Sequence, residues 1–177
     1  SKGNPKAESL SEESGRAGTP AYMAPEMARC EFRQIGPLSD IYLLGGILYE
    51  IVTGLAPHGG KDVWECLHQA TENLIQKTDD DDELLDVARK AMASNPKDRY
   101  QSVKDLQKAI RECRAHHESV AITHQARQRL TNATESASYD LFAETVFAYR
   151  QALTLWSDNQ EATDGLLDAQ RAYAEAA

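Results

Sequence analysis

The most constraining feature of the sequence is a segment of helical length, residues 40–53, that is apolar on almost every side. It reads DIYLLGGILYEIVT, and its aliphatic residues recur too often to form a single stripe. A helix that is apolar around its whole circumference has to be buried on all sides. Gly45 and Gly46 permit another backbone to approach closely. We therefore expect a central helix, capped by Ser39 and ended by Gly54.

The rest of the chain also reads as helical, so the expected fold class is mainly α. Helices are expected at about 61–75, 83–93, 102–116, 119–137, 140–155 and 159–176. Ser102 with Asp105, and Asp158 with Glu161, have the spacing of helix caps. The acidic run 79–82 is interpreted as a solvated loop that complements a helix dipole, because it lacks the alternating ligands of a calcium loop.

Composition narrows the possible functions. The formal net charge of -9 argues against general nucleic-acid binding, which needs basic surface. The surplus of negative charge either attracts basic protein substrates or only keeps the protein soluble, and the second interpretation is simpler. Cys30, Cys66 and Cys113 lack zinc-ligand spacing, so we expect free thiols and no metal site. The longest apolar run, 41–49, is too short to span a bilayer, and we expect a cytoplasmic protein.

The strongest functional signal is the nine-residue string GTPAYMAPE at residues 18–26. It resembles the end of the activation segment of serine/threonine protein kinases, which closes on Ala-Pro-Glu. The resemblance implies that Thr19 supports a catalytic Asp and Lys, and that the substrate residues are Ser and Thr rather than Tyr. The substrate-binding residues that it implies are Gly18, Thr19, Pro20, Ala21 and Tyr22.

Three further positions resemble structural residues of the kinase C-terminal lobe. Residues 95–100, NPKDRY, are similar to the loop before the last lobe helix. The resemblance implies a buried ion pair between Glu26 and Arg99, whose planar guanidinium suits a carboxylate. Asp40 with Gly45 resembles the start of the central lobe helix, where the Asp holds the catalytic loop. Asp40 is equally compatible with an ordinary first-turn helix residue.

Residues 1–17 are polar and without hydrophobic period, which is typical of a flexible loop. By the resemblance they are the remainder of an activation loop. Ser11 and Ser14 lie in the zone where such loops are phosphorylated, and a phosphate there would order the loop by pairing with an Arg. Both serines are candidate phosphosites.

The sequence lacks several kinase motifs. It contains no glycine-rich loop, strand lysine, H-R-D-x-x-x-x-N loop or D-F-G. These motifs normally precede the activation segment, so we expect them upstream in a longer parent polypeptide. ATP and Mg²⁺ are then cofactors of that parent, and its N-terminal lobe and catalytic loop are partners of this chain. We expect the chain alone to be catalytically inactive, with no catalytic residue.

The C-terminal part reads as helical hairpins beyond the kinase resemblance. Ala148, Tyr149, Ala152 and Leu153 resemble the second helix of a tetratricopeptide repeat, although the match is partial. A plain helical extension is the alternative. Trp156 is either an anchor for a protein partner or a packed aromatic residue.

The domain organisation expected from the sequence is an activation-loop remnant at 1–17, a partial kinase C-terminal lobe at 18–118 and a helical hairpin region at 119–177. The function implied by the resemblance is ATP-dependent phosphorylation of protein Ser or Thr in a bacterial signalling kinase. The alternative is a pseudokinase or scaffold protein that acts through its helical C-terminal region.

Overall fold

The computed structural model describes residues 19–79, 81–136 and 138–176. These residues form helices and connecting loops with no strand, which confirms the expected mainly α fold class. The chain divides into two compact units, Ser1–Ile110 and Arg111–Ala177.

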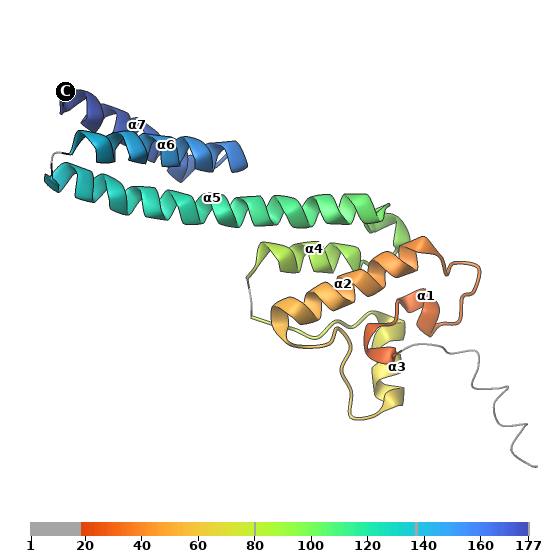
Figure 1. Ribbon diagram of the computed structural model, residues 1–177. Helices are drawn as coiled ribbons and strands as arrows, with labels where there is room; N and C mark the ends of the chain where they lie inside the picture. The colour runs from red at the N-terminus through yellow and green to blue at the C-terminus, as the bar shows by residue number, and fades with distance from the viewer. Residues whose placement is uncertain (1–18, 80, 137, 177) are drawn as a thin grey trace, which may run out of the picture. The chain divides into compact units, whose positions relative to one another are not determined.

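In the first unit the described elements lie around part of one long helix (Figure 1). Their bounds are η2 (Pro20–Tyr22), α1 (Pro25–Ala28), α2 (Pro37–Thr53), α3 (Val63–Glu72), α4 (Glu83–Ala91) and η3 (Pro96–Asp98). Helix α5 (Val103–Ser136) begins in this unit and continues into the second.

Helix α2 begins three residues earlier than the sequence predicts. Gly36 is its N-cap residue and Pro37 occupies the first helical position, where the fixed φ of proline favours a helix start. Ser39 is therefore not the cap. Its hydroxyl lies inside the first turn and accepts a hydrogen bond from the Gly36 N–H at 3.2 Å. The helix ends as predicted, with Gly54 in the left-handed region at φ 72°.

One face of α2 forms the core of the first unit. Tyr42 and Tyr49 are fully buried in a cluster with residues of α4, and Figure 1 shows the two helices side by side. The expected close approach occurs at Gly45, where an added Cβ would lie 2.6 Å from the Ala91 Cβ. A larger residue at position 45 would separate the helices.

The opposite face of α2 is partly exposed. Leu44, Ile47 and Ile51 are 39%, 49% and 74% exposed. A helix that is apolar all round needs cover on every side, and within the described chain this face has only partial cover from the first turns of α5, where Val103, Leu106 and Ile110 line a groove along it. Apolar surface of this extent normally marks a site of contact with other protein.

Helix α5 is continuous, whereas the sequence predicts separate helices at 102–116 and 119–137. The residues at the expected break, His117 and Glu118, are compatible with a helix, and neither glycine nor proline interrupts the segment. Ser102 caps the helix as predicted: its Oγ accepts from the Asp105 N–H at 3.1 Å and donates to the Asp105 carboxylate at 2.7 Å.

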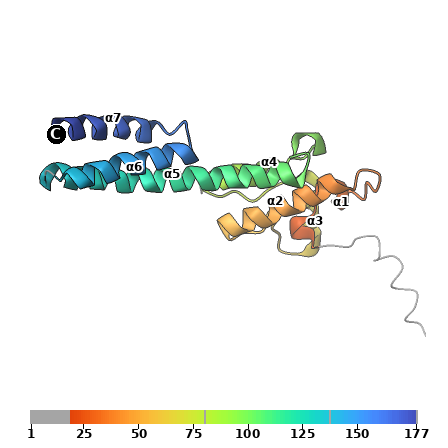
Figure 2. The ribbon, with the colours of Figure 1, turned by 45° about the horizontal axis from the view of Figure 1, so that its top comes forward.

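The second unit consists of the later turns of α5 with α6 (Tyr139–Leu155) and α7 (Gln160–Glu175). Figure 2 shows α6 and α7 side by side, and they make the most extensive helix pair in the unit. Small residues let the helices pack closely. The buried cluster is Ala126, Ala148, Tyr149, Ala152, Ala162 and Ala169.

The cap of α7 is Asn159 and not the predicted Asp158. The Asn159 Oδ1 accepts from the Ala162 N–H at 3.0 Å. Its amide also donates to Ser119 Oγ at 2.8 Å and to Thr123 Oγ1 at 3.2 Å on α5. Asp158 is exposed. The choice between these neighbours rests on the buried partners from α5, which are distant in sequence.

Candidate functional site

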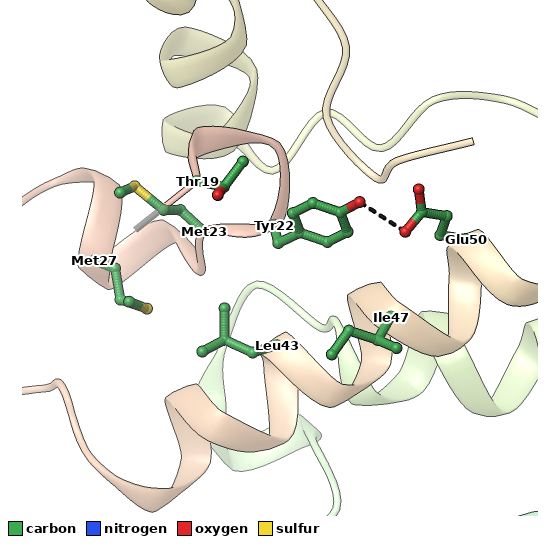
Figure 3. A pocket seen from close by; sticks show the side chains of 7 residues that line it. All are labelled: Thr19, Tyr22, Met23, Met27, Leu43, Ile47 and Glu50. Carbon is green, nitrogen blue, oxygen red and sulfur yellow. Dashed lines mark hydrogen bonds between the residues drawn. The ribbon is translucent and has the colours of Figure 1, made fainter. Parts of the chain in front are cut away.

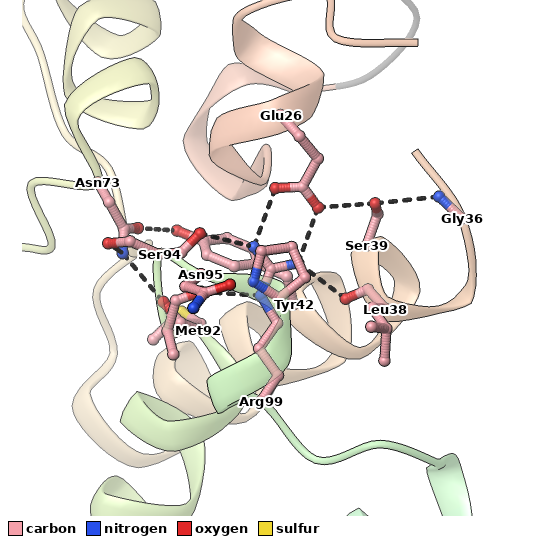
Figure 4. A network of polar contacts seen from close by, with 12 residues as sticks. Glu26, Gly36, Leu38, Ser39, Tyr42, Asn73, Met92, Ser94, Asn95 and Arg99 are labelled. Carbon is pink, nitrogen blue, oxygen red and sulfur yellow. Dashed lines mark hydrogen bonds and ion pairs between the residues drawn. The ribbon is translucent and has the colours of Figure 1, made fainter. Parts of the chain in front are cut away.

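The candidate site is built around one buried ion pair between residues that are 73 positions apart (Figure 4). The Arg99 Nη1 lies 2.7 Å from the Glu26 Oε1, and the Arg99 Nη2 lies 2.9 Å from the Glu26 Oε2. Both residues are 2% exposed. This two-pronged geometry is the strongest form of a carboxylate–guanidinium contact.

Local structure brings each partner to this point. Glu26 lies in the first turn of α1, directly after Pro25 at the helix start. Arg99 follows η3, which is capped by the Asn95 side chain at 3.2 Å from the Lys97 N–H. Prolines therefore begin both short helices and fix the backbone before each charged residue.

The remaining hydrogen-bonding groups of the pair are also used. The Ser39 hydroxyl donates to the Glu26 Oε1 at 2.7 Å. Arg99 donates from Nη1 to the Leu38 carbonyl at 2.9 Å and from Nε to the Ala93 carbonyl at 2.8 Å. The ion pair thus joins α1, the start of α2 and the loop before α5. Because it is fully hydrogen-bonded, it can remain charged although it is buried.

The protonation of Glu26 follows from this setting. Burial favours the neutral acid, but hydrogen bonds from Arg99 and Ser39 outweigh burial and hold the pKa of the Glu26 carboxyl below its ordinary value. The Arg99 guanidinium also lies over the Tyr42 ring, with its Cζ 4.9 Å from the ring centroid. Burial raises the pKa of the Tyr42 hydroxyl, which stays protonated.

The network continues through residues that the sequence does not reveal as site residues. The Tyr42 hydroxyl lies 2.8 Å from His58 Nε2, and His58 Nδ1 lies 3.1 Å from the Leu74 carbonyl oxygen. His58 is 1% exposed, and burial lowers the pKa of its imidazole. Asn73 donates to the Met92 carbonyl at 3.0 Å. Asn73 ends α3 in the left-handed conformation at φ 53°, a position where Asn is favoured. The sequence therefore indicates Asn73 as a helix end but does not indicate its contact with Met92.

A second feature of the site is an apolar pocket of about 490 Å³ beside the predicted substrate-binding stretch (Figure 3). Its lining residues are Thr19, Tyr22, Met23, Met27, Leu43, Ile47 and Glu50. The Tyr22 hydroxyl donates to the Glu50 Oε2 at 2.7 Å, and this hydrogen bond to a carboxylate raises the pKa of Tyr22. The pocket therefore combines an apolar surface with the Glu50 carboxylate.

The other predicted site residues lie as follows. Thr19 is exposed, and Pro20, Ala21 and Tyr22 form η2. The Ala21 carbonyl accepts from the His58 N–H at 3.0 Å, which ties η2 to the network. Gly18 and the candidate phosphosites lie outside the described residues.

Asp40 is not part of the buried network. It is exposed in the first turn of α2, next to Ser39, and its carboxylate has no hydrogen bond or ion pair with another residue in the described part of the chain. The serine before it makes the contact with Glu26 instead.

Neither a cluster of metal-ligating side chains nor a membrane-spanning helix occurs among the described residues. Among them, no group of three or more His, Cys, Asp or Glu side chains is placed to hold a metal ion. No helix in the ranges 19–79, 81–136 and 138–176 has both the length and the apolar character needed to cross a membrane.

Several curated bacterial proteins are similar to about half of this chain. The serine/threonine-protein kinase PkaA of Streptomyces coelicolor is 39% identical over 95 residues, which cover 53% of this chain and 17% of that protein. The serine/threonine-protein kinase PknB of Mycolicibacterium smegmatis is 37% identical over 94 residues, or 50% of this chain and 15% of that protein. The serine/threonine-protein kinase PknD of Chlamydia felis is 38% identical over 97 residues, or 52% of this chain and 10% of that protein.

No protein-family model matches the chain. The stretch matched in each of these relatives is a small part of that protein, from 10% to 17% of its length. Identity at this level over more than ninety residues nevertheless reflects common ancestry, and the names of these relatives agree with the kinase-like motifs of the sequence. About half of this chain is therefore homologous to bacterial serine/threonine protein kinases, and its motifs are those of the kinase C-terminal lobe.

Proposed function

We propose that this chain is the substrate-facing and scaffold part of a serine/threonine protein kinase, which transfers the γ-phosphoryl group of ATP to Ser or Thr hydroxyls of proteins. The observation that carries the proposal is the buried contact of Glu26 with Arg99 and Ser39, at 2.7 Å in each case, in a chain related to such kinases. The stretch from Gly18 to Tyr22 then faces the protein substrate.

The ion pair serves as a scaffold in this function. Glu26 lies four residues after Tyr22, and Arg99 binds both Glu26 and the Leu38 carbonyl at the start of α2. The end of the substrate-facing stretch is thereby held against α2. Rigid placement of a substrate is a large part of catalysis, because it removes the entropy cost of orientation.

The exposed parts of α2 serve to bind the rest of the enzyme. Asp40 is exposed at the start of the helix, where its carboxylate is free to accept backbone N–H groups of a catalytic loop. Leu44, Ile47 and Ile51 offer an apolar face to other helices of the lobe. We assign Thr19 a role in supporting the catalytic Asp and Lys of that loop.

The cofactors of the reaction are ATP and Mg²⁺, and the described residues do not form a site for them. Magnesium in kinases is held by carboxylate and amide oxygens together with the phosphates, and no cluster of acidic side chains in the described ranges fits this demand. We therefore derive no step through these groups. The chain alone is proposed to bind no ATP and to transfer no phosphoryl group.

The remaining assignments extend the same proposal. The parent enzyme acts in the cytoplasm, and Ser11 and Ser14 are its candidate regulatory phosphosites. The helical region 119–177 is a site for a protein partner, in the manner of a tetratricopeptide repeat. Mass spectrometry of the active parent tests the phosphosites, and the absence of phosphate from residues 1–19 would remove them.

A chimaera tests the main proposal. The ATP-binding lobe, catalytic loop and magnesium loop of the Mycolicibacterium smegmatis kinase are joined to residue 1 of this chain. We expect the chimaera to phosphorylate Ser and Thr peptides, and the isolated chain to give neither phosphate transfer nor a thermal shift with Mg-ATP. Thr19→Ala should lower transfer by about 10- to 100-fold, whereas Thr131→Ala, an exposed control, should not.

Two results would contradict the proposal in different ways. Labelled phosphate transfer by the isolated chain would show a catalytic site that the motifs do not predict. A chimaera that folds and binds ATP but phosphorylates no peptide would favour the pseudokinase or scaffold alternative.

A further inference from the structure

The second unit contains a small polar pocket that the proposed kinase function does not use. It has a volume of about 90 Å³ and lies between α5, α6 and α7. Its lining residues are Thr123, His124, Arg127, Leu130, Tyr149, Glu161, Gly165 and Asp168. Most of these side chains are polar or ionisable, in contrast to the apolar pocket of the first unit.

The two walls of the pocket carry opposite charge. Helix α5 contributes Arg127, which lies four residues after Thr123 and three before Leu130 and so shares their face. Helix α7 contributes Glu161 and Asp168, which are seven residues apart and also share a face. A cationic wall therefore faces an anionic wall across the space.

The floor of the pocket is the side chain of Tyr149 from α6. Tyr149 is 2% exposed as a whole residue, and its hydroxyl has no hydrogen bond with any residue in the described ranges. No fully buried side-chain polar atom in the described part of the chain lacks a hydrogen-bond partner, so this hydroxyl reaches the open space of the pocket. Gly165 allows this placement, because a Cβ on Gly165 would lie 2.4 Å from the Tyr149 ring. The hydroxyl is thus held at the pocket without a protein partner.

The charged side chains at the pocket are available as well. Arg127 and Glu161 have no ion pair with another described residue, and Asp168 has only an exposed contact of 4.0 Å with Arg171. All three charges act on the Tyr149 hydroxyl, although burial is the main cause that raises the pKa of Tyr149. All three charged residues line the pocket together with Tyr149.

We propose that this pocket binds a small zwitterion of the free α-amino acid class. The ligand carboxylate lies against Arg127, its ammonium group lies against Glu161 and Asp168, and the Tyr149 hydroxyl bonds the carboxylate. The volume of the pocket is that of about three water molecules in the liquid, which suits the head group of an amino acid with a minimal side chain.

Simple ions fit the pocket less well than a zwitterion. A lone cation meets the Arg127 guanidinium, and a lone anion meets the two carboxylates, so each loses part of its attraction to repulsion. A peptide terminus carries one of the two charges and leaves one wall without a partner. Only a ligand with both charges a few bonds apart satisfies both walls.

Calorimetric titration of the full chain with glycine tests the proposal. We expect glycine to bind at millimolar concentration, as befits a ligand of very few atoms. Glycinamide, which lacks the carboxylate, and N-acetylglycine, which lacks the ammonium group, should each bind at least about tenfold more weakly. Amide NMR shifts at Gly165 and Arg127 should report the glycine site.

Variants locate the site independently of the analogues. Arg127→Gln and Asp168→Asn should each weaken glycine binding about tenfold, and Tyr149→Phe about threefold. Arg129→Gln is the matched control, since Arg129 is exposed on the same helix and does not line the pocket. Circular dichroism checks that each variant is folded.

The proposal fails if glycine produces neither heat nor NMR shifts at millimolar concentration. It also fails if glycinamide and N-acetylglycine bind as well as glycine, a result that needs no variant. Equal glycine binding by Arg127→Gln and Arg129→Gln would place the site elsewhere.

Discussion

The two units of this chain bury polar groups in different ways. The first unit buries a charged pair, Glu26 and Arg99, and the two side chains form further hydrogen bonds with Ser39 and the Leu38 carbonyl. The second unit buries a neutral group in which the Asn159 amide donates to the Ser119 and Thr123 hydroxyls. Both arrangements connect segments that are distant in sequence.

The first unit depends more strongly on a single contact than the second unit does. A buried charge that loses its partner remains unpaired, so the stability of the first unit depends on both Glu26 and Arg99. A neutral hydrogen bond that is lost costs less. The first unit also leaves one face of α2 partly exposed, whereas buried alanines bring the helices of the second unit into close contact.

The largest expected effect is that of Arg99→Ala. Removal of one partner of the buried pair should lower the free energy of unfolding of the first unit by about 3–5 kcal/mol. Urea unfolding measures this, and Trp64 and Trp156 provide one fluorescent probe in each unit. Arg89→Ala is the control: its contact with Asp86 is exposed, and its loss should cost less than about 1 kcal/mol. Similar costs for both variants would contradict the comparison.

The corresponding change in the second unit is Asn159→Ala. It removes the cap of α7 and two buried hydrogen bonds, and it should cost about 2–3 kcal/mol in the unfolding of the second unit. Asp158→Ala, at the neighbouring exposed position, should change the free energy of unfolding by less than about 0.5 kcal/mol. If Asp158→Ala were the more harmful variant, the assignment of the cap would be wrong.

A smaller effect is expected at the glycines where helices approach closely. A Cβ on Gly45 would lie 2.6 Å from the Ala91 Cβ, and one on Gly165 would lie 2.4 Å from the Tyr149 ring. Alanine has a higher helix propensity than glycine, and this difference offsets part of the strain that the added Cβ causes. Gly45→Ala and Gly165→Ala should therefore cost about 1–3 kcal/mol, each in its own unit. Thermal unfolding distinguishes the units, and stabilisation by either variant would show that the helices can separate freely.

The response to acid should also separate the units. Burial lowers the pKa of His58, so the unfolded chain binds a proton more readily, and stability is lost as the pH falls below the unfolded value of about 6.5. The lowered pKa of Glu26 removes further stability as the pH falls below the ordinary range of Glu. Ser119, Thr123 and Asn159 do not titrate.

Unfolding measured between pH 8 and pH 4 at the two tryptophans should therefore show the first unit weakening before the second. His58→Phe should remove the part of the dependence near neutral pH. Identical pH profiles for the two units would contradict this prediction.

The sequence predicts much of this structure because local signals decide it. The apolar segment 40–53 predicts α2, and Gly54 ends it, since glycine tolerates the left-handed conformation. The kinase-like motifs indicate Glu26 and Arg99 as a pair, and the structure brings them together. The same motifs did not indicate His58 or Asn73, because their roles depend on the Tyr42 hydroxyl and not on neighbours in the chain.

The helical class, the apolar character of α2 and the kinase-like motifs follow from the sequence, because periodicity and short motifs are properties of adjacent residues. Three other features depend on the folded arrangement: Asn159 rather than Asp158 caps α7, α5 is continuous, and Tyr149 shares a pocket with charged residues of α5 and α7. Each of these depends on which side chains meet across helices, and such contacts are fixed by packing in three dimensions.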